Sequence, residues 1–256
     1  MGKIFVGVMK YFSILFFISI VLSQTGYEIA QRINNHPTPD DVKAKLVMTL
    51  ENKRGDKMES IIISHIKDDG KKQIMWFLSP PSDRGISLYK IEKDNDKDEM
   101  KMWLPAFKKV RKISSRRKSE SFMNSDLTFE DFYNREIDDY TYQLETSKDS
   151  LYYILTSIPN KDIKSSYSKH ISWVNIKSLL VDEEQSFEKS GTLIKTKEFK
   201  FIKVDGFDMV KEIYVIDSKT KHKTYLSFDE IIINSGLKDR EFHEMNLRRI
   251  PIDEQN

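Results

Sequence analysis

The sequence contains no cysteine, and this absence excludes disulfides, thiolate metal sites, iron–sulfur clusters and cysteine nucleophiles together. Neither sign of charge is in excess, because 42 Lys and Arg stand against 40 Asp and Glu. A chain this close to neutral has no strong overall field to attract nucleic acid. Hydrophobic residues nevertheless make up 39% of the 256 residues, which is enough for a core and excludes general disorder.

Motifs for catalysis or metal binding are also missing. The five histidines form no pair at ligand spacing. The segment that begins at His243 resembles a zinc-protease helix, but Leu247 stands where the second histidine is needed. The acidic segment 94–99 has Glu99 where a calcium loop needs glycine. No nucleophile elbow, phosphate loop or glycine-rich dinucleotide turn occurs. We therefore expect no enzyme, no metal and no cofactor.

The N-terminus has the pattern of an export signal. The first ten residues carry two lysines and no acid, and residues 11–22 are apolar apart from two serines. This run is shorter than the roughly 20 residues of a membrane-spanning helix. Small and medium residues before Gln24 favour cleavage after Ser23. We expect a signal peptide at 1–23 and one exported, periplasmic domain at 24–256; an uncleaved membrane anchor is the alternative.

The remaining chain has the periodicity of an antiparallel β protein. Tyr27, Ile29, Ala30 and Ile33 have the spacing of a short amphipathic helix. From residue 42 onward, apolar residues recur at every second position in short runs between turn residues. The expected strands include 42–50, 58–66, 72–78, 85–91, 99–104, 140–145, 151–158, 170–176, 179–184, 192–204, 209–216 and 224–232. The prediction is a mainly β, single-domain protein with about eleven strands and a tight hairpin at Asp205-Gly206.

The middle of the chain is unusual in charge and in aromatic content. Residues 108–118 contain seven basic residues and no acid. Residues 119–133 follow with several large apolar side chains, too many for a freely mobile loop. Thr128 and Asp131 fit a capping box and predict a short helix near 128–134. The basic run is consistent with a solvated sheet edge or with a contact to an anionic partner.

This middle segment resembles a known family. Residues 103–113 and 121–132 look like the outer membrane lipoprotein-sorting protein family, a LolA-like group often linked to RND/MMPL-type exporters. The proline turn at 80–88 and the ending at 234–242 resemble the same family. Asn124 departs from the pattern, because the family usually has glycine there. Asn tolerates left-handed backbone conformations, so we expect the turn to be kept.

The resemblance implies a fold and a task. The fold is a strongly curved, incomplete antiparallel barrel with an apolar concave side and short helices closing its mouth. The task is that of a periplasmic carrier for the acyl chains of lipoproteins or other lipids, moved toward the outer membrane and paired with an RND/MMPL-type transporter. Each CH₂ group exposed to water costs about 0.8 kcal/mol, so an acylated cargo needs an apolar cleft to travel. We expect a monomer.

The candidate binding residues are large side chains of the middle segment and of the strand before it. The candidates for the cleft and its lid are Met75, Trp76, Trp103, Phe107, Phe122, Met123, Phe129 and Phe132. The candidates for a polar rim are Arg111, Arg116 and Arg117. Ordinary core packing is the alternative for each apolar residue. The alternative function is an envelope sensor or regulatory binding protein with the same fold; a secreted hydrolase is disfavoured by the missing motifs.

Overall fold

The computed structural model describes residues 25–93 and 97–251, and the expected signal peptide at 1–23 lies outside them. The first part of the chain forms α1 (Gly26–Asn34), β1 (Asp41–Glu51), β2 (Lys57–Lys67), β3 (Lys72–Ser79), β4 (Ser87–Ile91), β5 (Glu99–Leu104), η1 (Pro105–Phe107) and β6 (Lys109–Lys112). The second part forms η2 (Ser115–Arg117), η3 (Phe129–Phe132), η4 (Ile137–Asp139), β7 (Tyr140–Thr146), β8 (Tyr152–Pro159), β9 (Tyr167–Asn175), β10 (Val181–Glu188), β11 (Leu193–Val204), β12 (Phe207–Asp217), β13 (Lys223–Ile233), η5 (Asp239–Phe242) and η6 (Glu244–Arg248). Helix α1 begins at a capping box of Thr25 and Glu28, which supports the amphipathic helix expected there.

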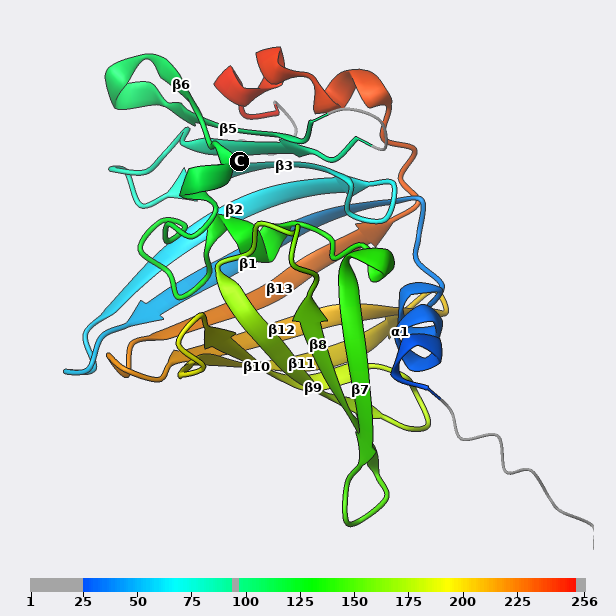
Figure 1. Ribbon diagram of the computed structural model, residues 1–256. Coiled ribbons are helices and arrows are strands. Elements are labelled where there is room, and N and C mark those ends of the chain that lie inside the picture. Colours follow the sequence, from blue (N-terminus) through cyan, green and yellow to red (C-terminus); the bar gives the residue numbers. More distant parts are fainter. Residues whose placement is uncertain (1–24, 94–96, 252–256) are drawn as a thin grey trace, which may run out of the picture.

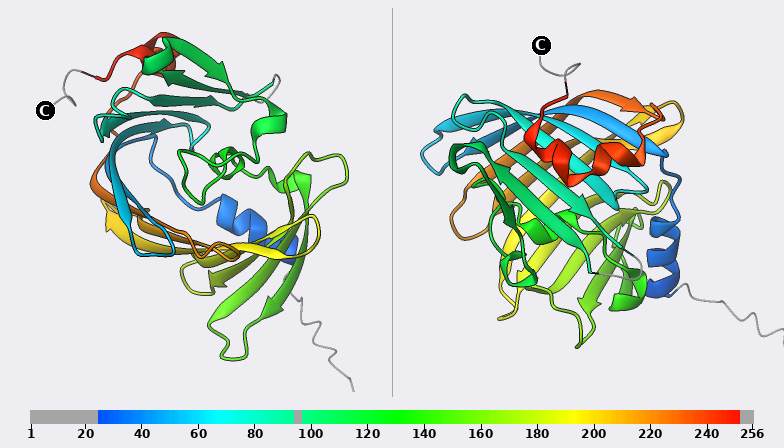
Figure 2. Two further views of the ribbon diagram at one scale, coloured as in Figure 1. Left: turned by 90° about the vertical axis from the view of Figure 1, so that its left-hand side faces the viewer. Right: turned by 90° about the horizontal axis from the view of Figure 1, so that it is seen from above.

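All described strands belong to one antiparallel sheet of thirteen strands (Figure 1). Their order is β6-β5-β4-β3-β2-β1-β13-β12-β11-β10-β9-β8-β7. Neighbouring strands are therefore consecutive in sequence except for β1 and β13, and the consecutive strands β6 and β7 are not neighbours. The sheet is strongly curved but open, with β6 and β7 as its two edges (Figure 2). This confirms the expected incomplete antiparallel barrel. The count exceeds the expected eleven, in part because β6, with three basic residues and Val110, shows no apolar alternation.

The segment between the two edge strands, residues 113–139, is called the connector below. It leaves β6 and returns to β7 by crossing the concave side of the sheet, where Figure 2 shows it inside the curve. Phe122, Leu127 and Phe129 of the connector pack into the concave core with residues of β1 to β5, β12 and β13. The connector therefore occupies part of the space that an open half-barrel would leave to solvent.

The turn at the start of the connector has the expected backbone geometry. Asn124 has φ of +60°, in the left-handed region that asparagine tolerates. The Ser125 amide donates to the Phe122 carbonyl at 2.8 Å and closes the turn. Thr128 and Asp131 form the expected capping box. The short helix that follows is η3, a 3₁₀ helix rather than an α-helix.

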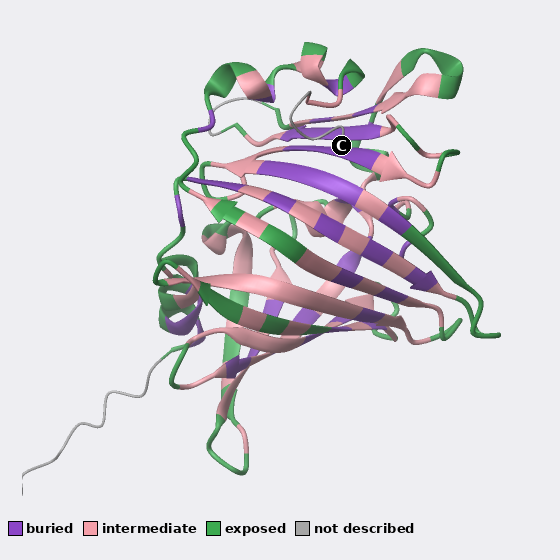
Figure 3. Ribbon diagram, turned by 180° about the vertical axis from the view of Figure 1, so that it is seen from behind, coloured by how far each residue is buried: buried purple, intermediate pink, exposed green. Residues whose placement is uncertain are grey.

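The convex face of the strands β2 to β5 is covered by the C-terminal segment. Leu237, Phe242 and Leu247 pack against this face, and the Trp76 indole donates to the Asn246 carbonyl at 3.0 Å. This covering leaves β3 and β4 buried along most of their length (Figure 3). The start of the segment is fixed by Asp41, whose carboxylate accepts the amides of Ser235, Gly236 and Leu237 at 2.8 to 3.0 Å.

Candidate functional site

An apolar cleft of about 550 Å³ lies between the connector and the concave face of the sheet. Its apolar walls come from strands β1, β2, β3, β10, β11, β12 and β13 and from the connector. The apolar lining residues are Leu46, Met48, Ile62, Ile66, Met75, Phe122, Leu127, Phe132, Val181, Phe199, Val210, Ile213, Leu226 and Phe228. The volume lies in the range of about 300–1,000 Å³ that ligand pockets occupy.

The cleft continues toward one end of the half-barrel. A second apolar cavity of about 270 Å³ shares Ile66, Val210, Ile213 and Phe228 with the first. Its outer lining includes Pro39, Gly70, Met209 and Ile231. We call these two adjoining cavities the apolar tract; it lies along β1, β2, β12 and β13, from the connector to the chain around residue 39.

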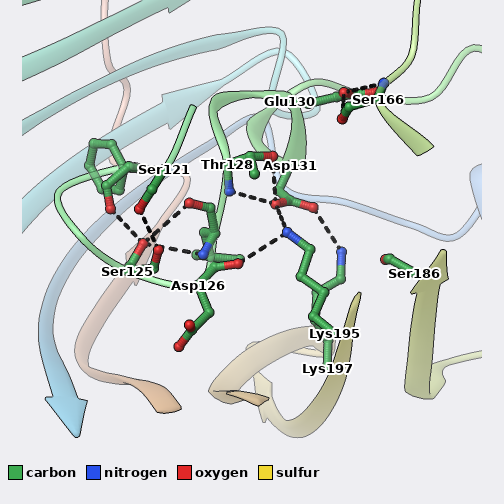
Figure 4. A network of polar contacts seen from close by, with 12 residues as sticks. Ser121, Ser125, Asp126, Thr128, Glu130, Asp131, Ser166, Ser186, Lys195 and Lys197 are labelled. Atoms are coloured by element: carbon green, nitrogen blue, oxygen red, sulfur yellow. Dashed lines mark hydrogen bonds and ion pairs between the residues drawn. The ribbon is translucent and has the colours of Figure 1, made fainter. Parts of the chain in front are cut away.

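A cluster of charges forms part of one wall of the cleft; we call it the charge cluster, and its members are Asp131, Arg135, Glu184, Lys195 and Lys197. All except Arg135, whose side chain is 33% exposed, are nearly buried, and all except Lys195 line the cleft. Lys195 and Lys197 extend from β11 to Asp131 of the connector, with N–O distances of 2.5 and 3.1 Å (Figure 4). Burial alone would raise the pKa of Asp131, but the charges of Lys197 and Lys195 hold it well below its usual range. Asp131 is therefore ionised throughout the physiological range.

The second carboxylate of the charge cluster is Glu184 on β10. Arg135 of the connector donates to both of its oxygens, at 2.6 and 2.7 Å, and Lys197 Nζ lies 2.8 Å from Oε1. The burial of Glu184 opposes ionisation, but the charges of Arg135 and Lys197 hold its pKa well below its usual range. A bidentate guanidinium–carboxylate pair is strong and fixed in direction. It ties the end of the connector to the sheet.

Two further buried groups border the charge cluster. The Tyr167 hydroxyl lies 3.1 Å from both Asp131 oxygens, and burial followed by the charge of Asp131 raises its pKa. His170 Nδ1 lies 3.0 Å from the Ser186 hydroxyl, and burial followed by the charge of Arg135 lowers the pKa of His170 to about 3. Both side chains are neutral at pH 7.

The charge cluster separates the apolar cleft from a polar cavity of about 400 Å³, since Asp131 and Arg135 line both.

The sequence-based candidates divide among several places. Met75, Phe122 and Phe132 line the apolar cleft. Phe129 is buried in the core beneath it, with its ring centroid 5.9 Å from that of Phe122. Met123 packs at the margin of the same core. The structure therefore brings these five residues together on the concave side.

The other apolar candidates lie elsewhere. Trp76 and Trp103 belong to the cluster on the convex face, under the C-terminal segment, so the prediction that they line the cleft is corrected. Neighbouring residues of a strand point to opposite faces, and Trp76 therefore cannot share the cleft with Met75. Phe107 ends η1 and is 70% exposed at the tip of the β5–β6 hairpin, away from the cleft.

The three candidate rim arginines lie at the edge of the sheet. Arg111 on β6 forms an ion pair with Glu120, and Arg117 lies 3.8 Å from the same carboxylate. Arg116 is exposed in η2. None of the three lines the apolar cleft among the described residues.

The sequence-based reasoning missed the charge cluster. Its signal was present in β11, where Lys195, Lys197 and Phe199 occupy alternate positions and therefore one face. Lysines at inward positions beside an aromatic residue are unusual in a half-buried strand. The partner carboxylates Asp131 and Glu184 are distant in sequence, so pairing them required the fold.

Two features are absent from residues 25–93 and 97–251. No group of His, Cys, Asp and Glu in this part of the chain could hold a metal ion. Within the same residues, no helix has both the length and the apolar character needed to cross a membrane.

The open, curved antiparallel half-barrel is a LolA-like fold, because solved structures that include a LolA superfamily protein share it. A protein described as an outer membrane lipoprotein-sorting protein domain, from Vibrio parahaemolyticus, superposes with a TM-score of 0.81 at 24% identity, over 88% of this chain and 98% of that one. A DUF1329 family protein from Desulfovibrio piger gives 0.79 at 28% identity, over 87% and 97%. A LolA superfamily protein from Nitrosomonas europaea gives 0.70 at 18% identity, over 88% and 100%.

The chain belongs to the family whose model matches residues 69–249, a family described as "Uncharacterized protein". No curated protein matches the sequence. The predicted likeness of the chain to outer membrane lipoprotein-sorting proteins is confirmed by the structural neighbours. The half-barrel is thus shared with such proteins over nearly the whole described chain.

Proposed function

We propose that the protein is a non-enzymatic carrier that binds acyl chains of lipoproteins or other lipids in the apolar cleft. The observation that supports this most is the apolar tract, two adjoining cavities that extend from the connector to the region of Pro39 and Ile231. A solid core would leave no such space, whereas a carrier needs one that is apolar and elongated. Transfer of each CH₂ group from water into the tract is favourable by about 0.8 kcal/mol.

The likeness to lipoprotein-sorting and LolA superfamily proteins supports the same function. We further propose a periplasmic location after cleavage between Ser23 and Gln24, and an RND/MMPL-type transporter of the inner membrane as the partner. The intact mass of the periplasmic protein tests the cleavage, since retention of residues 1–23 would contradict it. Co-purification with the tagged protein tests the partner, and a repeated failure to recover such a transporter would contradict it.

Neighbouring residues on β13 give a sharp test of acyl-chain binding. Ile231 lines the outer part of the tract, whereas Ile232 points to the other face and is 56% exposed. A carboxylate placed against an acyl chain must be desolvated or neutralised, which costs free energy. We expect Ile231→Asp to weaken binding of a fluorescent fatty-acid probe at least tenfold, or about 1.4 kcal/mol.

The matched control, Ile232→Asp, should bind the probe as the wild-type protein does. Thermal unfolding of both variants tests whether a difference in probe affinity reflects a loss of folding. Equal probe affinity for Ile231→Asp and the wild-type protein would show that the acyl chain binds elsewhere, and would contradict the proposal. Lipid mass spectrometry of the purified protein adds an independent readout, because a carrier retains lipid through purification.

A further inference from the structure

The charge cluster lies in the wall of the apolar cleft, although binding an uncharged acyl chain requires no charged residues. Lys197 and Asp131 have side-chain exposures of 7% and 4%, and both line the cleft, whose lining is otherwise mostly apolar. Burying ion pairs carries a large desolvation cost, and apolar residues of similar volume often replace them without loss of stability. A purely structural role therefore does not explain why these charges lie in the wall of the cleft.

The acceptors of the charge cluster are already occupied. Asp131 accepts from the Thr128 amide at 2.7 Å, from Lys195 and from Lys197, and it contacts the Tyr167 hydroxyl. Glu184 accepts twice from Arg135 and lies within 2.8 Å of Lys197. A carboxylate offers about four lone-pair sites. Neither carboxylate has much capacity left for a further donor.

The donors, in contrast, are in surplus. Lys197 carries three N–H donors and uses two of them on Asp131 and Glu184. Arg135 carries five and its described hydrogen bonds use two, both on Glu184. Both residues line the cleft. The charge cluster also holds three cations against two carboxylates, so it has one positive charge in excess.

Two nearby carboxylates do not cancel this excess within the cleft. Glu130 accepts from the Ser166 amide at 2.8 Å and lines the polar cavity instead. The Asp126 carboxylate is held by the Thr224 hydroxyl at 2.7 Å and by His222, and it does not line the cleft. His170 adds no positive charge at pH 7 because its pKa lies near 3.

We infer that the charge cluster is the head-group subsite of the cleft, and that the ligand is an acyl amphiphile with an anionic carboxylate or phosphate group. The anionic group accepts hydrogen bonds from Lys197 and Arg135, while the chain lies along Val210, Ile213 and Phe228. This inference rests on the proposed function, since it names the class of lipid that the cleft takes. Charge-assisted hydrogen bonds are strong enough to select such a ligand, the more so from Lys197, which is nearly buried.

The test compares ligands that share one chain and differ in the head group. Palmitate, palmitoyl lysophosphatidic acid and neutral monopalmitoylglycerol are titrated at pH 8 against displacement of the fluorescent fatty-acid probe. We expect one or both anionic ligands to bind about tenfold more tightly than the neutral one. Preference for palmitate or for the lysophosphatidic acid identifies a carboxylate or a phosphate as the favoured head group.

The decisive variant is Lys197→Met, which leaves Asp131 paired with Lys195 and Glu184 paired with Arg135. It should reduce the anionic preference to less than about threefold and keep the affinity for the neutral ligand. The control is Lys200→Met on the same strand, whose side chain is 75% exposed; it should match the wild-type protein. Arg135→Gln, which leaves Glu184 with Lys197, gives a second test of the same preference.

The outcomes separate the two proposals. Equal affinity of the wild-type protein for all three ligands overturns the head-group subsite and leaves the carrier function intact. A full anionic preference in both folded variants, Lys197→Met and Arg135→Gln, also overturns it. Failure of every ligand to bind contradicts the carrier function and the subsite together.

Discussion

Lys197 Nζ lies 3.1 Å from Asp131 Oδ1 and 2.8 Å from Glu184 Oε1, so one buried lysine joins the connector to the wall of the half-barrel. Asp131 and Lys197 are 66 residues apart in the chain. Arg135 repeats the link by binding Glu184 with two hydrogen bonds. The connector is therefore held in the concave side by ion pairs as well as by its apolar residues, and the shape of the cleft depends on both.

Asp131→Asn should destabilise the protein strongly. The change removes the negative charge that pairs with buried Lys195. Breaking a buried ion pair by removing one partner costs about 3–5 kcal/mol of folding stability. The control is Asp229→Asn on β13, whose side chain is 50% exposed beside Lys211 and which should lose no more than about 1 kcal/mol. Urea unfolding measures both. Similar losses in the two variants would show that the charge cluster is not a structural link.

Stability should fall as the pH drops below about 6.5, in part because of His170. Its pKa is about 3 in the folded protein against an ordinary value of 6.5, so the unfolded chain takes up a proton that the folded protein refuses. The stability from this group is full above pH 6.5 and is lost progressively toward pH 3. Between pH 6 and pH 5 the loss should be about 1 kcal/mol.

The variant His170→Gln should flatten this pH dependence. Its free energy of unfolding is measured at pH 6 and pH 5 and compared with the wild-type protein, so that any constant cost of the substitution cancels. His243→Gln, at an exposed position in the C-terminal segment, is the control and should keep the wild-type slope. An unchanged slope in His170→Gln would contradict the prediction.

Asn124→Gly should be neutral or mildly stabilising, whereas Asn124→Val should cost about 1–2 kcal/mol. The φ angle of +60° is open to glycine and asparagine but is resisted by β-branched residues. Thermal unfolding compares the two variants. Equal melting temperatures of the two variants would contradict the prediction that position 124 needs a residue that tolerates positive φ.

Phe132→Asp should reduce probe binding more than it reduces stability, because Phe132 lines the cleft and is only partly buried. Phe129 is 3% exposed in the core, so Phe129→Asp should leave a buried charge in every folded molecule and abolish stable folding. Thermal unfolding and probe affinity are measured on the same purified variants. Unchanged affinity in well-folded Phe132→Asp would show that this side chain does not touch the ligand.

The sequence predicted the class of fold because period-two alternation is a local property. Residues 42–50 and 58–66 show it clearly, and β1 and β2 follow these bounds within one residue at either end. The pairing of β1 with β13 is not local, and neither is the path of the connector. Both depend on packing between segments far apart in the sequence, which no local pattern specifies.

The site was predicted only in part. Phe122 and Phe132 were found because they lie in the recognised segment. Trp76 was misplaced because strand alternation defines two faces without saying which one is concave. The convex assignment follows from the C-terminal segment, since Leu247 packs on that face. Lys195 and Lys197 were missed because an inward lysine is recognised only once its carboxylates are placed beside it.

Photo-crosslinking with a diazirine-labelled fatty acid tests the binding of acyl chains in the cleft most directly. The purified protein is irradiated with the bound probe, and the modified residues are mapped by peptide mass spectrometry. We expect labelling on the concave positions Val210, Ile213 and Phe228, and loss of this labelling when unlabelled palmitoyl lipid competes. Labelling confined to the convex face around Trp76 and Trp103, or labelling that no competing lipid reduces, would contradict it.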